Sequence, residues 1–300
     1  MKTLLVLLGP TGVGKTDLSI GIAKAFGTEI ISCDSRQIYK EMRIGTAVPS
    51  PGQLAAVRHH FIQMISVHDY YNSWQFEVQA LGRIRELFQE KEVVLMTGGS
   101  MLYIDAVCKG IDDIPTISPE LRTGLMEVYE REGLESIRQM LKELDPVFYG
   151  QVDLNNGKRV LHAVEVCRMA GVPYSSLRKN TPKDRGFRIV RIGLNREREE
   201  LYARIDRRVD LMLEEGLEDE ARRLWPLRHL NALNTVGYKE LFDYFEGKTD
   251  YAEAVRLIKR NSRRYARKQL SWFRRDDDIR WFHPDDYEGI VEAIRLMKIG

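Results

Sequence analysis

The chain has 300 residues, of which 43% are hydrophobic and 30% are charged, and its net charge of +2 is too small to indicate a nucleic-acid binder by itself. This composition is ordinary for a protein that buries a core, so it excludes a largely disordered chain, and the length allows two domains or one domain with an insertion. Cys33, Cys108 and Cys167 form no CxxC pair, and no apolar run approaches the roughly 20 residues that span a bilayer, so we expect a cytoplasmic protein without disulfides.

The first part of the chain alternates apolar strands with helices. Residues 3–8 form an apolar, β-prone run, the turn at 9–14 is rich in glycine, and apolar residues then recur at helical spacing. Further strands are predicted at 29–32 and 93–96, with a helix at 73–89 between them. This alternation is typical of a parallel sheet covered by helices on both faces, so the predicted fold class is α/β.

The pattern becomes helical after the turn-forming stretch 112–119. One further strand is predicted at 187–194, and helical patterns follow it. The simplest topology is an α/β core that is interrupted by a small all-helical insertion. We place the core at residues 1–114 and 186–300, and the insertion at 115–185.

Residues 9–16 read GPTGVGKT and match the phosphate-binding pattern GxxxxGK[ST] between a strand and a helix. Glycines let successive backbone N–H groups converge on phosphate oxygens, and the helix N-terminus adds its positive end. A lysine supplies a full charge, and a threonine hydroxyl can bind Mg²⁺. The alternative is a glycine turn that binds no ligand. We predict a P-loop NTPase-like core with these diphosphate- or nucleotide-binding residues: Gly9, Pro10, Thr11, Gly12, Val13, Gly14, Lys15 and Thr16.

One carboxylate stands at the end of a predicted strand. P-loop proteins that hydrolyse nucleotides usually carry an aspartate after a second apolar strand, but strand 93–96 is followed by Thr97-Gly98-Gly99. Whether ATP binds therefore stays open. Asp34 begins the segment DSRQ after strand 29–32, where ligands of open α/β sheets bind, and would suit a general base. The alternative is a helix N-cap, because Asp and Ser are favoured caps.

Residues 256–275 contain nine Lys or Arg and no acid, with aromatic residues among them. On a helix, Lys259, Arg260, Arg263, Arg264 and Arg267 form one basic face. Such a stripe would neutralise backbone phosphates of a nucleic acid. The alternative is a solvated helix face, which charge runs usually are.

A second helical segment carries Arg204 and Arg208 on one face at i, i+4 spacing. They could clamp an anion, or they could pair with Glu200 and Asp206.

Together these segments resemble the tRNA dimethylallyltransferase family, also called tRNA isopentenyltransferases. DSRQ, IGTA.P, GG.MLY and Y.R.QL.WFR are far more specific than the P-loop, which many NTPases share. Ser100 stands where the family usually has Thr, and Asn156-Gly157-Lys158-Arg159 replaces a more arginine-rich stretch. In chain order the similarity covers GPTGVGKT at 9–16, DSRQIY at 34–39, IGTAVP at 44–49, HHFI at 59–62, GGSMLYI at 98–104, KRVLHAVEV at 158–166, VGYKEL at 236–241 and RRYARKQLSWFR at 263–274.

The resemblance implies a transferase that uses Mg²⁺. It would move a dimethylallyl group from dimethylallyl diphosphate to N6 of the adenosine 3′-adjacent to the tRNA anticodon. By the same resemblance Thr16 and Arg208 would act on the leaving diphosphate, with Thr16 also holding the metal, and Asp34 would accept the N6 proton. Modifying a stacked base also requires its extrusion.

The insertion would close over the anticodon stem-loop of tRNA. We expect a monomer with no membrane contact. Three alternative functions compete with this one: a nucleoside or nucleotide kinase, an isopentenyltransferase of free adenine nucleotides, and a non-enzymatic RNA-binding protein. The expected tRNA-binding residues are Asp34, Ser35, Arg36, Gln37, Ser100, Arg122, Lys158, Arg159, Val160, Leu161, His162, Asn234, Thr235, Val236, Gly237, Tyr238, Lys239, Arg263, Arg264 and Arg267.

Overall fold

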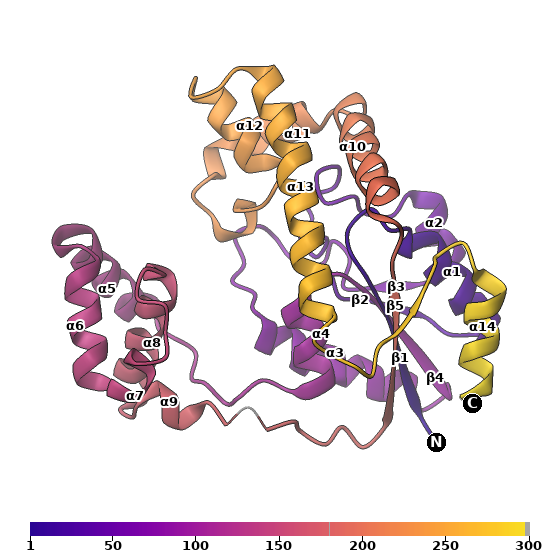
Figure 1. Ribbon diagram of the computed structural model, residues 1–300, viewed down its shortest axis with the longest axis horizontal. Helices are drawn as coiled ribbons and strands as arrows, with labels where there is room; N and C mark the ends of the chain where they lie inside the picture. The colour runs from indigo at the N-terminus through magenta and orange to yellow at the C-terminus, as the bar shows by residue number, and fades with distance from the viewer. Residues whose placement is uncertain (180, 298–300) are drawn as a thin grey trace. The chain divides into compact units, whose positions relative to one another are not determined.

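The computed structural model describes residues 1–179 and 181–297. Its strands form one parallel sheet in the order β3-β2-β4-β1-β5-β6 (Figure 1). The predicted α/β class is therefore confirmed. The strands are β1 (Thr3–Leu8), β2 (Ile30–Ser32), β3 (His59–His60), β4 (Val93–Gly98), β5 (Arg188–Leu194) and β6 (Arg280–Phe282).

The central strand β1 explains how the sheet is covered on both faces. All its residues are buried, as expected for a parallel sheet with helices on either side. Because side chains alternate along a strand, Leu4 and Val6 pack in one hydrophobic cluster and Leu5 and Leu7 in the other. Truncating such a buried leucine to alanine costs about 2–5 kcal/mol of stability.

Helices from both ends of the chain cover the sheet (Figure 1). The cluster around Leu4 includes residues of α3 and α4, and the cluster around Leu5 includes residues of α1 and α14. The helices of this part are α1 (Lys15–Ala25), α2 (Pro51–Ala56), α3 (Ser73–Leu87), α4 (Met101–Lys109), α10 (Arg198–Glu214), α11 (Leu217–Leu224), α12 (Tyr238–Phe245), α13 (Tyr251–Phe273) and α14 (Tyr287–Leu296), with the short 3-10 helices η1 (Trp225–Leu227) and η2 (Asn231–Leu233).

The chain divides into two compact units, Met1–Cys108 with Arg185–Gly300, and Lys109–Asp184. The second unit has its own core, in which Ile137, Leu141 and Val164 are fully buried. The amide of Lys183 donates to the carbonyl of Lys109 at 2.7 Å, so the two ends of this unit lie side by side. Its helices are α5 (Pro119–Glu132), α6 (Leu134–Leu144), α7 (Pro146–Tyr149), α8 (Gly157–Ala170) and α9 (Tyr174–Leu177).

Two expectations from composition can be compared with the described residues. All three cysteines are buried thiols. Across residues 1–179 and 181–297, no helix has the length and apolar character needed to cross a membrane.

Candidate active site

A large cleft opens at the carboxyl edge of the sheet and has a volume of about 1910 Å³. It is lined by the P-loop (residues 9–16), by the segments that follow β2 and β4, and by residues of α10 and α13. Open α/β sheets bind ligands at this edge. The cleft therefore gathers segments that are far apart in the sequence.

The P-loop wraps around the start of α1. Gly12 and Gly14 have φ of +80° and +109°, which L side chains rarely adopt, and a Cβ on Gly12 would lie 2.7 Å from Ile205. The Lys15 ammonium donates to the carbonyls of Gly9 and Pro10 at 3.0 and 2.8 Å. The loop thus holds its lysine with backbone oxygens and leaves amides of the following turn for an anion.

Two cations of the cleft have no carboxylate partner within the described residues. Burial lowers the pKa of Lys15 to about 8, helped by the positive charge of Arg208 and opposed by Asp34. Burial also lowers the pKa of Arg208, and Asp34 opposes this shift. Lys15, Arg208 and Asp34 therefore lie within electrostatic reach of one another. Two desolvated cations without a counter-ion form an arrangement that an incoming anion would stabilise.

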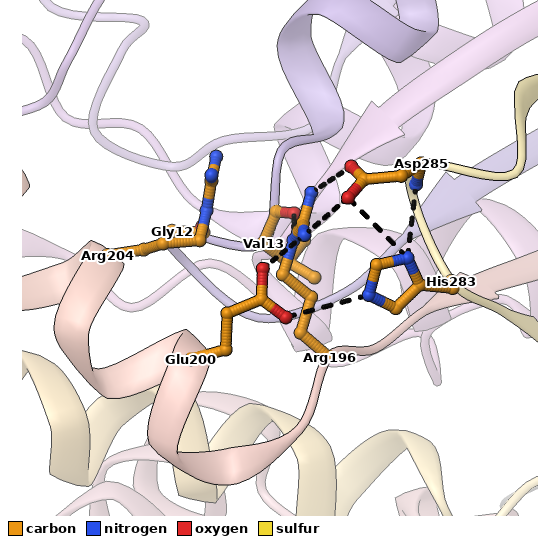
Figure 2. Close-up of polar contacts among 7 residues, drawn as sticks. All are labelled: Gly12, Val13, Arg196, Glu200, Arg204, His283 and Asp285. Atoms are coloured by element: carbon orange, nitrogen blue, oxygen red, sulfur yellow. Dashed lines mark hydrogen bonds and ion pairs between the residues drawn. The ribbon is translucent and has the colours of Figure 1, made fainter.

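Two arginines hold the outer side of the P-loop (Figure 2). Arg196 donates to the carbonyl of Val13 at 3.0 Å, and Arg204 donates to the carbonyl of Gly12 at 3.1 Å. In a trans peptide the N–H points opposite to the C=O. The two contacts therefore direct the amides that follow these carbonyls away from the arginines.

Arg196 is buried, and its guanidinium meets an exposed group of side chains, Glu200, His283 and Asp285 (Figure 2). His283 contacts the two acids of this group. Its guanidinium pairs with Glu200 and with both oxygens of Asp285. Because both carboxylates already bind this cation, we assign Glu200 and Asp285 to holding Arg196, and not to a metal. The alternative partners considered for Arg208 are thus occupied, since Glu200 pairs with Arg196 and Asp206 pairs with Arg263.

Asp34 begins a tight turn after β2, not a helix. Its Oδ1 accepts from the amides of Arg36 and Gln37 at 2.8 and 3.2 Å. No described residue donates to Oδ2, so this oxygen is available to a ligand. The hydroxyl of Ser100 accepts from the Ser35 amide at 2.8 Å and donates to the Ser35 hydroxyl at 3.1 Å, which joins the turn to the segment after β4.

Helix α13 contributes two side chains that the basic pattern did not single out as site residues. Gln269 is buried, accepts from the amide of Thr11 at 2.9 Å and donates to the carbonyl of Gly99 at 2.8 Å. Tyr265 lines the cleft, and burial, together with the charge of Asp34, raises its pKa to about 12. Helix α13 is therefore bonded to the P-loop through Gln269 and presents a protonated phenol to the cleft.

The basic face of α13 is divided between paired and unpaired charges. Lys259 pairs with Asp210 at 2.6 Å, and Arg263 binds both oxygens of Asp206 at 2.5 and 2.6 Å. The acids come from α10, so positive and negative charges lie side by side on this part of the folded surface. Arg264, Arg267 and Lys268 are exposed and have no ion pair among the described residues.

The other expected tRNA-binding residues either line the cleft, are buried, or lie in the second unit. Residues 234–237 and Lys239 line the cleft, whereas the Tyr238 side chain is fully buried and donates to Glu220. In the second unit, Lys158 and Arg159 are exposed, and Arg122 and His162 both bind Glu165.

Three of the expected RNA-contacting residues have side chains inside the fold. Val160 and Leu161 pack in the core of the second unit, and Tyr238 packs in the core of the first. Contact with RNA at these three positions would therefore have to come from the backbone, and it stays a prediction. They lie on the same helical segments as residues that face outward, and the sequence motif alone could not distinguish the buried positions from the exposed ones.

Comparisons with known proteins agree over nearly the whole chain. A family model described as "IPP transferase" matches residues 37–276. A protein of Parabacteroides distasonis named tRNA dimethylallyltransferase 2 is 59% identical over 290 residues, which cover 97% of each chain. A solved tRNA isopentenylpyrophosphate transferase from Bacillus halodurans is 34% identical with a TM-score of 0.71, covering 99% of this chain and 96% of its own. A eukaryotic dimethylallyltransferase acting on tRNA shares the fold, with a TM-score of 0.83 at 24% identity, covering 99% of this chain and 79% of its own.

Proposed function

Because this chain belongs to the IPP transferase family of tRNA dimethylallyltransferases, we propose that it transfers a dimethylallyl group from dimethylallyl diphosphate to N6 of the adenosine 3′-adjacent to a tRNA anticodon. The observation that carries the proposal is one cleft in which the Asp34 carboxylate lies within electrostatic reach of two cations without counter-ions, Lys15 and Arg208. A base beside an anion site suits an amine acceptor and a diphosphate leaving group.

In the proposed reaction, the N6 lone pair forms a bond to C1 of the dimethylallyl group. The bond between C1 and the diphosphate oxygen breaks, and its electrons leave with the diphosphate. Asp34 accepts one N6 proton through Oδ2, because Oδ1 is already bonded to two backbone amides. The turn thus fixes the base while leaving one oxygen to react.

The leaving diphosphate would be bound by the P-loop. Lys15 and Arg208 supply positive charge where negative charge develops, and amides at the start of α1 add oriented donors. Thr16 lines the cleft, and its hydroxyl is an oxygen ligand of the kind Mg²⁺ prefers, so it would hold the metal together with diphosphate oxygens. Bound Mg²⁺ would neutralise further charge on the leaving group.

The tRNA would contact three parts of the chain. Residues 234–239 line the same cleft as Asp34 apart from the buried Tyr238, and the exposed Arg264 and Arg267 offer unpaired charges to phosphates. In the second unit, Lys158, Arg159, Arg122 and His162 would contact the anticodon stem-loop.

The test is transfer of label from radiolabelled dimethylallyl diphosphate, with Mg²⁺, to unmodified tRNA, with AMP as a competing acceptor. Label in tRNA alone supports the proposal. Label in AMP would assign the protein to free nucleotides, and transfer of phosphate from ATP without any prenyl transfer would favour a kinase. The two donors are supplied in separate reactions so that the outcomes are distinct.

The base is tested by Asp34→Ala. We expect transfer to fall by about 10²–10⁴-fold, the usual contribution of a general base, while tRNA binding is retained. Circular dichroism verifies folding, and Asp34→Glu provides a variant that keeps the carboxylate. Unchanged transfer by folded Asp34→Ala would rule out the assigned role.

A further inference from the structure

Glu220, on α11, is a buried carboxylate that the proposed reaction does not use. It is 3% exposed and has no cationic partner among the described residues. Its Oε2 accepts from the amides of Arg43 and Ile44 at 3.1 and 2.9 Å. Its Oε1 accepts from the Gly45 amide at 2.9 Å and from the Tyr238 hydroxyl at 2.6 Å. Three consecutive backbone amides thus converge on one carboxylate, in the way that amides surround a bound anion.

The amides belong to a compact segment, the 43–48 loop. Within it the Ala47 amide donates to Ile44 and the Val48 amide donates to Arg43, at 2.9 and 3.1 Å. A Cβ on Gly45 would lie 2.7 Å from the Tyr238 ring, so the backbone packs directly against this tyrosine. Glu220 and Tyr238 together hold the 43–48 loop on its inner side.

The opposite side of the 43–48 loop holds Gln37. The Nε2 of Gln37 donates to the carbonyls of Thr46 and Ala47 at 3.1 and 2.9 Å. Both amide protons are therefore used, and a flipped amide would place its oxygen against two carbonyl oxygens. The remaining polar atom is Oε1, whose one contact, with the Ser32 hydroxyl, is long at 3.5 Å.

Asp34 and Gln37 both line the cleft, so the turn has two oxygens, Asp34 Oδ2 and Gln37 Oε1, that can serve there as acceptors. An ionised carboxylate only accepts hydrogen bonds, and the Gln37 amide is held so that it offers its oxygen. The exocyclic amine of adenine has two N–H donors, whereas hypoxanthine and guanine carry an acceptor oxygen at the same position. A site that presents two acceptors favours the amine and repels the oxygen.

We propose that Glu220 is a positioning residue for base selection: it fixes the 43–48 loop, which fixes the Gln37 amide, so that the site takes a 6-amino purine and rejects a 6-oxo purine. This inference rests on the proposed function, because it assumes that an extruded purine of tRNA enters the cleft beside Asp34.

The test compares binding of two anticodon stem-loops that carry adenosine or inosine at the acceptor position. In Glu220→Gln, one amide hydrogen would face backbone N–H groups, so the 43–48 loop and the Gln37 amide lose their fixed arrangement. We expect the adenosine-to-inosine affinity ratio to fall by about tenfold or more. The KM for dimethylallyl diphosphate should stay unchanged, since Glu220 touches no part of the P-loop.

Glu77→Gln is the matched control. Glu77 is similarly buried but lies on α3 and pairs with Arg185. Both variants should lose thermal stability, and the affinity ratio should change in Glu220→Gln alone. A merely structural role of Glu220 would lower stability in both and leave both ratios at the wild-type value.

Tyr238→Phe gives a milder second variant, because it removes one of the four hydrogen bonds to Glu220. A smaller fall in the ratio is expected. Wild-type ratios in folded Glu220→Gln overturn the inference; if that variant does not fold, a wild-type ratio in Tyr238→Phe overturns it. Absence of prenyl transfer to the adenosine stem-loop by the wild-type enzyme would instead refute the proposed function, since the binding ratio is measured independently of transfer.

Discussion

The positive charges of the cleft and those of α13 are held in opposite ways. Lys15 and Arg208 are desolvated and have no carboxylate partner among the described residues, and their pKa values are lowered. Lys259 and Arg263 are partly exposed and bind Asp210 and Asp206 of α10. The first arrangement costs stability until an anion arrives, whereas the second is already neutralised within the fold.

The difference shows that a cation without a carboxylate partner inside a cleft indicates a binding site better than a dense run of basic residues does. The run at 256–275 has more positive charges than the P-loop, yet part of it holds α13 against α10. The charges left for RNA are the exposed ones without an ion pair among the described residues, including Arg264 and Arg267.

The largest effect should come from Lys15→Met. Loss of this charge should lower kcat/KM for dimethylallyl diphosphate by about 10²–10³-fold, the usual effect of removing one group that stabilises developing charge. Thermal stability should stay the same or rise, because the substitution removes a partly desolvated cation that has no carboxylate partner among the described residues. Steady-state kinetics and thermal unfolding measure both. A marked loss of stability would show that Lys15 is structural and would remove the contrast with α13.

The second prediction concerns pH. In the proposed reaction, protonated Lys15 would attract the diphosphate. Its pKa in the free protein is about 8, so affinity should fall as the pH rises through 8. The fall should approach about tenfold per pH unit above that value. Bound diphosphate should raise this pKa, so calorimetry near pH 8 should detect proton uptake on binding. Lys15→Arg should flatten the profile, because a guanidinium stays charged; an equally steep profile in that variant would contradict the assignment.

A third, smaller effect separates the paired from the unpaired charges of α13. Arg264→Ala with Arg267→Ala should weaken tRNA binding and lower its salt dependence by about 0.7–0.9 in log–log slope for each phosphate that the protein no longer neutralises. Lys259→Ala with Arg263→Ala should change the slope less, since those charges are already paired. Binding at several salt concentrations measures both. Equal slopes for the two double variants would show that pairing with α10 does not decide RNA contact.

The smallest effect is expected for the pair of Arg263 and Asp206. A double-mutant cycle with alanine at each position should give a coupling energy of about 0.2–1 kcal/mol, because both side chains are partly solvated. Thermal or urea unfolding provides the measurement. A coupling energy well above this range would show that this ion pair contributes substantially to the packing of α13 on α10.

Local patterns predicted the parts of the site that lie within short segments. The P-loop and its helix, and the position of Asp34 after β2, depend on residues that are close in sequence and on the rule that ligands bind at the carboxyl edge of a sheet. The edge strands β3 and β6 are two and three residues long and were missed. The similarly short β2 was predicted because it contains the aliphatic pair Ile30-Ile31, whereas β3 and β6 consist of His-His and Arg-Trp-Phe and show no aliphatic run to distinguish them from loops.

Contacts between distant segments could not be predicted in the same way. Nothing near Arg263 indicates that Asp206 will neutralise it, and nothing near Gly45 indicates Glu220. Gln269 stands in a basic helix but bonds to the P-loop. These pairs form only when the chain has folded, and a single sequence carries no record of which distant residues meet.

The neighbouring ends of the second unit have a consequence for how this chain can vary. Lys109 and Lys183 share a backbone hydrogen bond. For the stability of the first unit, the whole intervening segment therefore counts as one closed loop. The entropy of closing a loop grows only with the logarithm of its length, so lengthening or shortening this segment costs the sheet little. Evolution can therefore remodel the helical unit, or exchange it for another, without changing the register of a single strand.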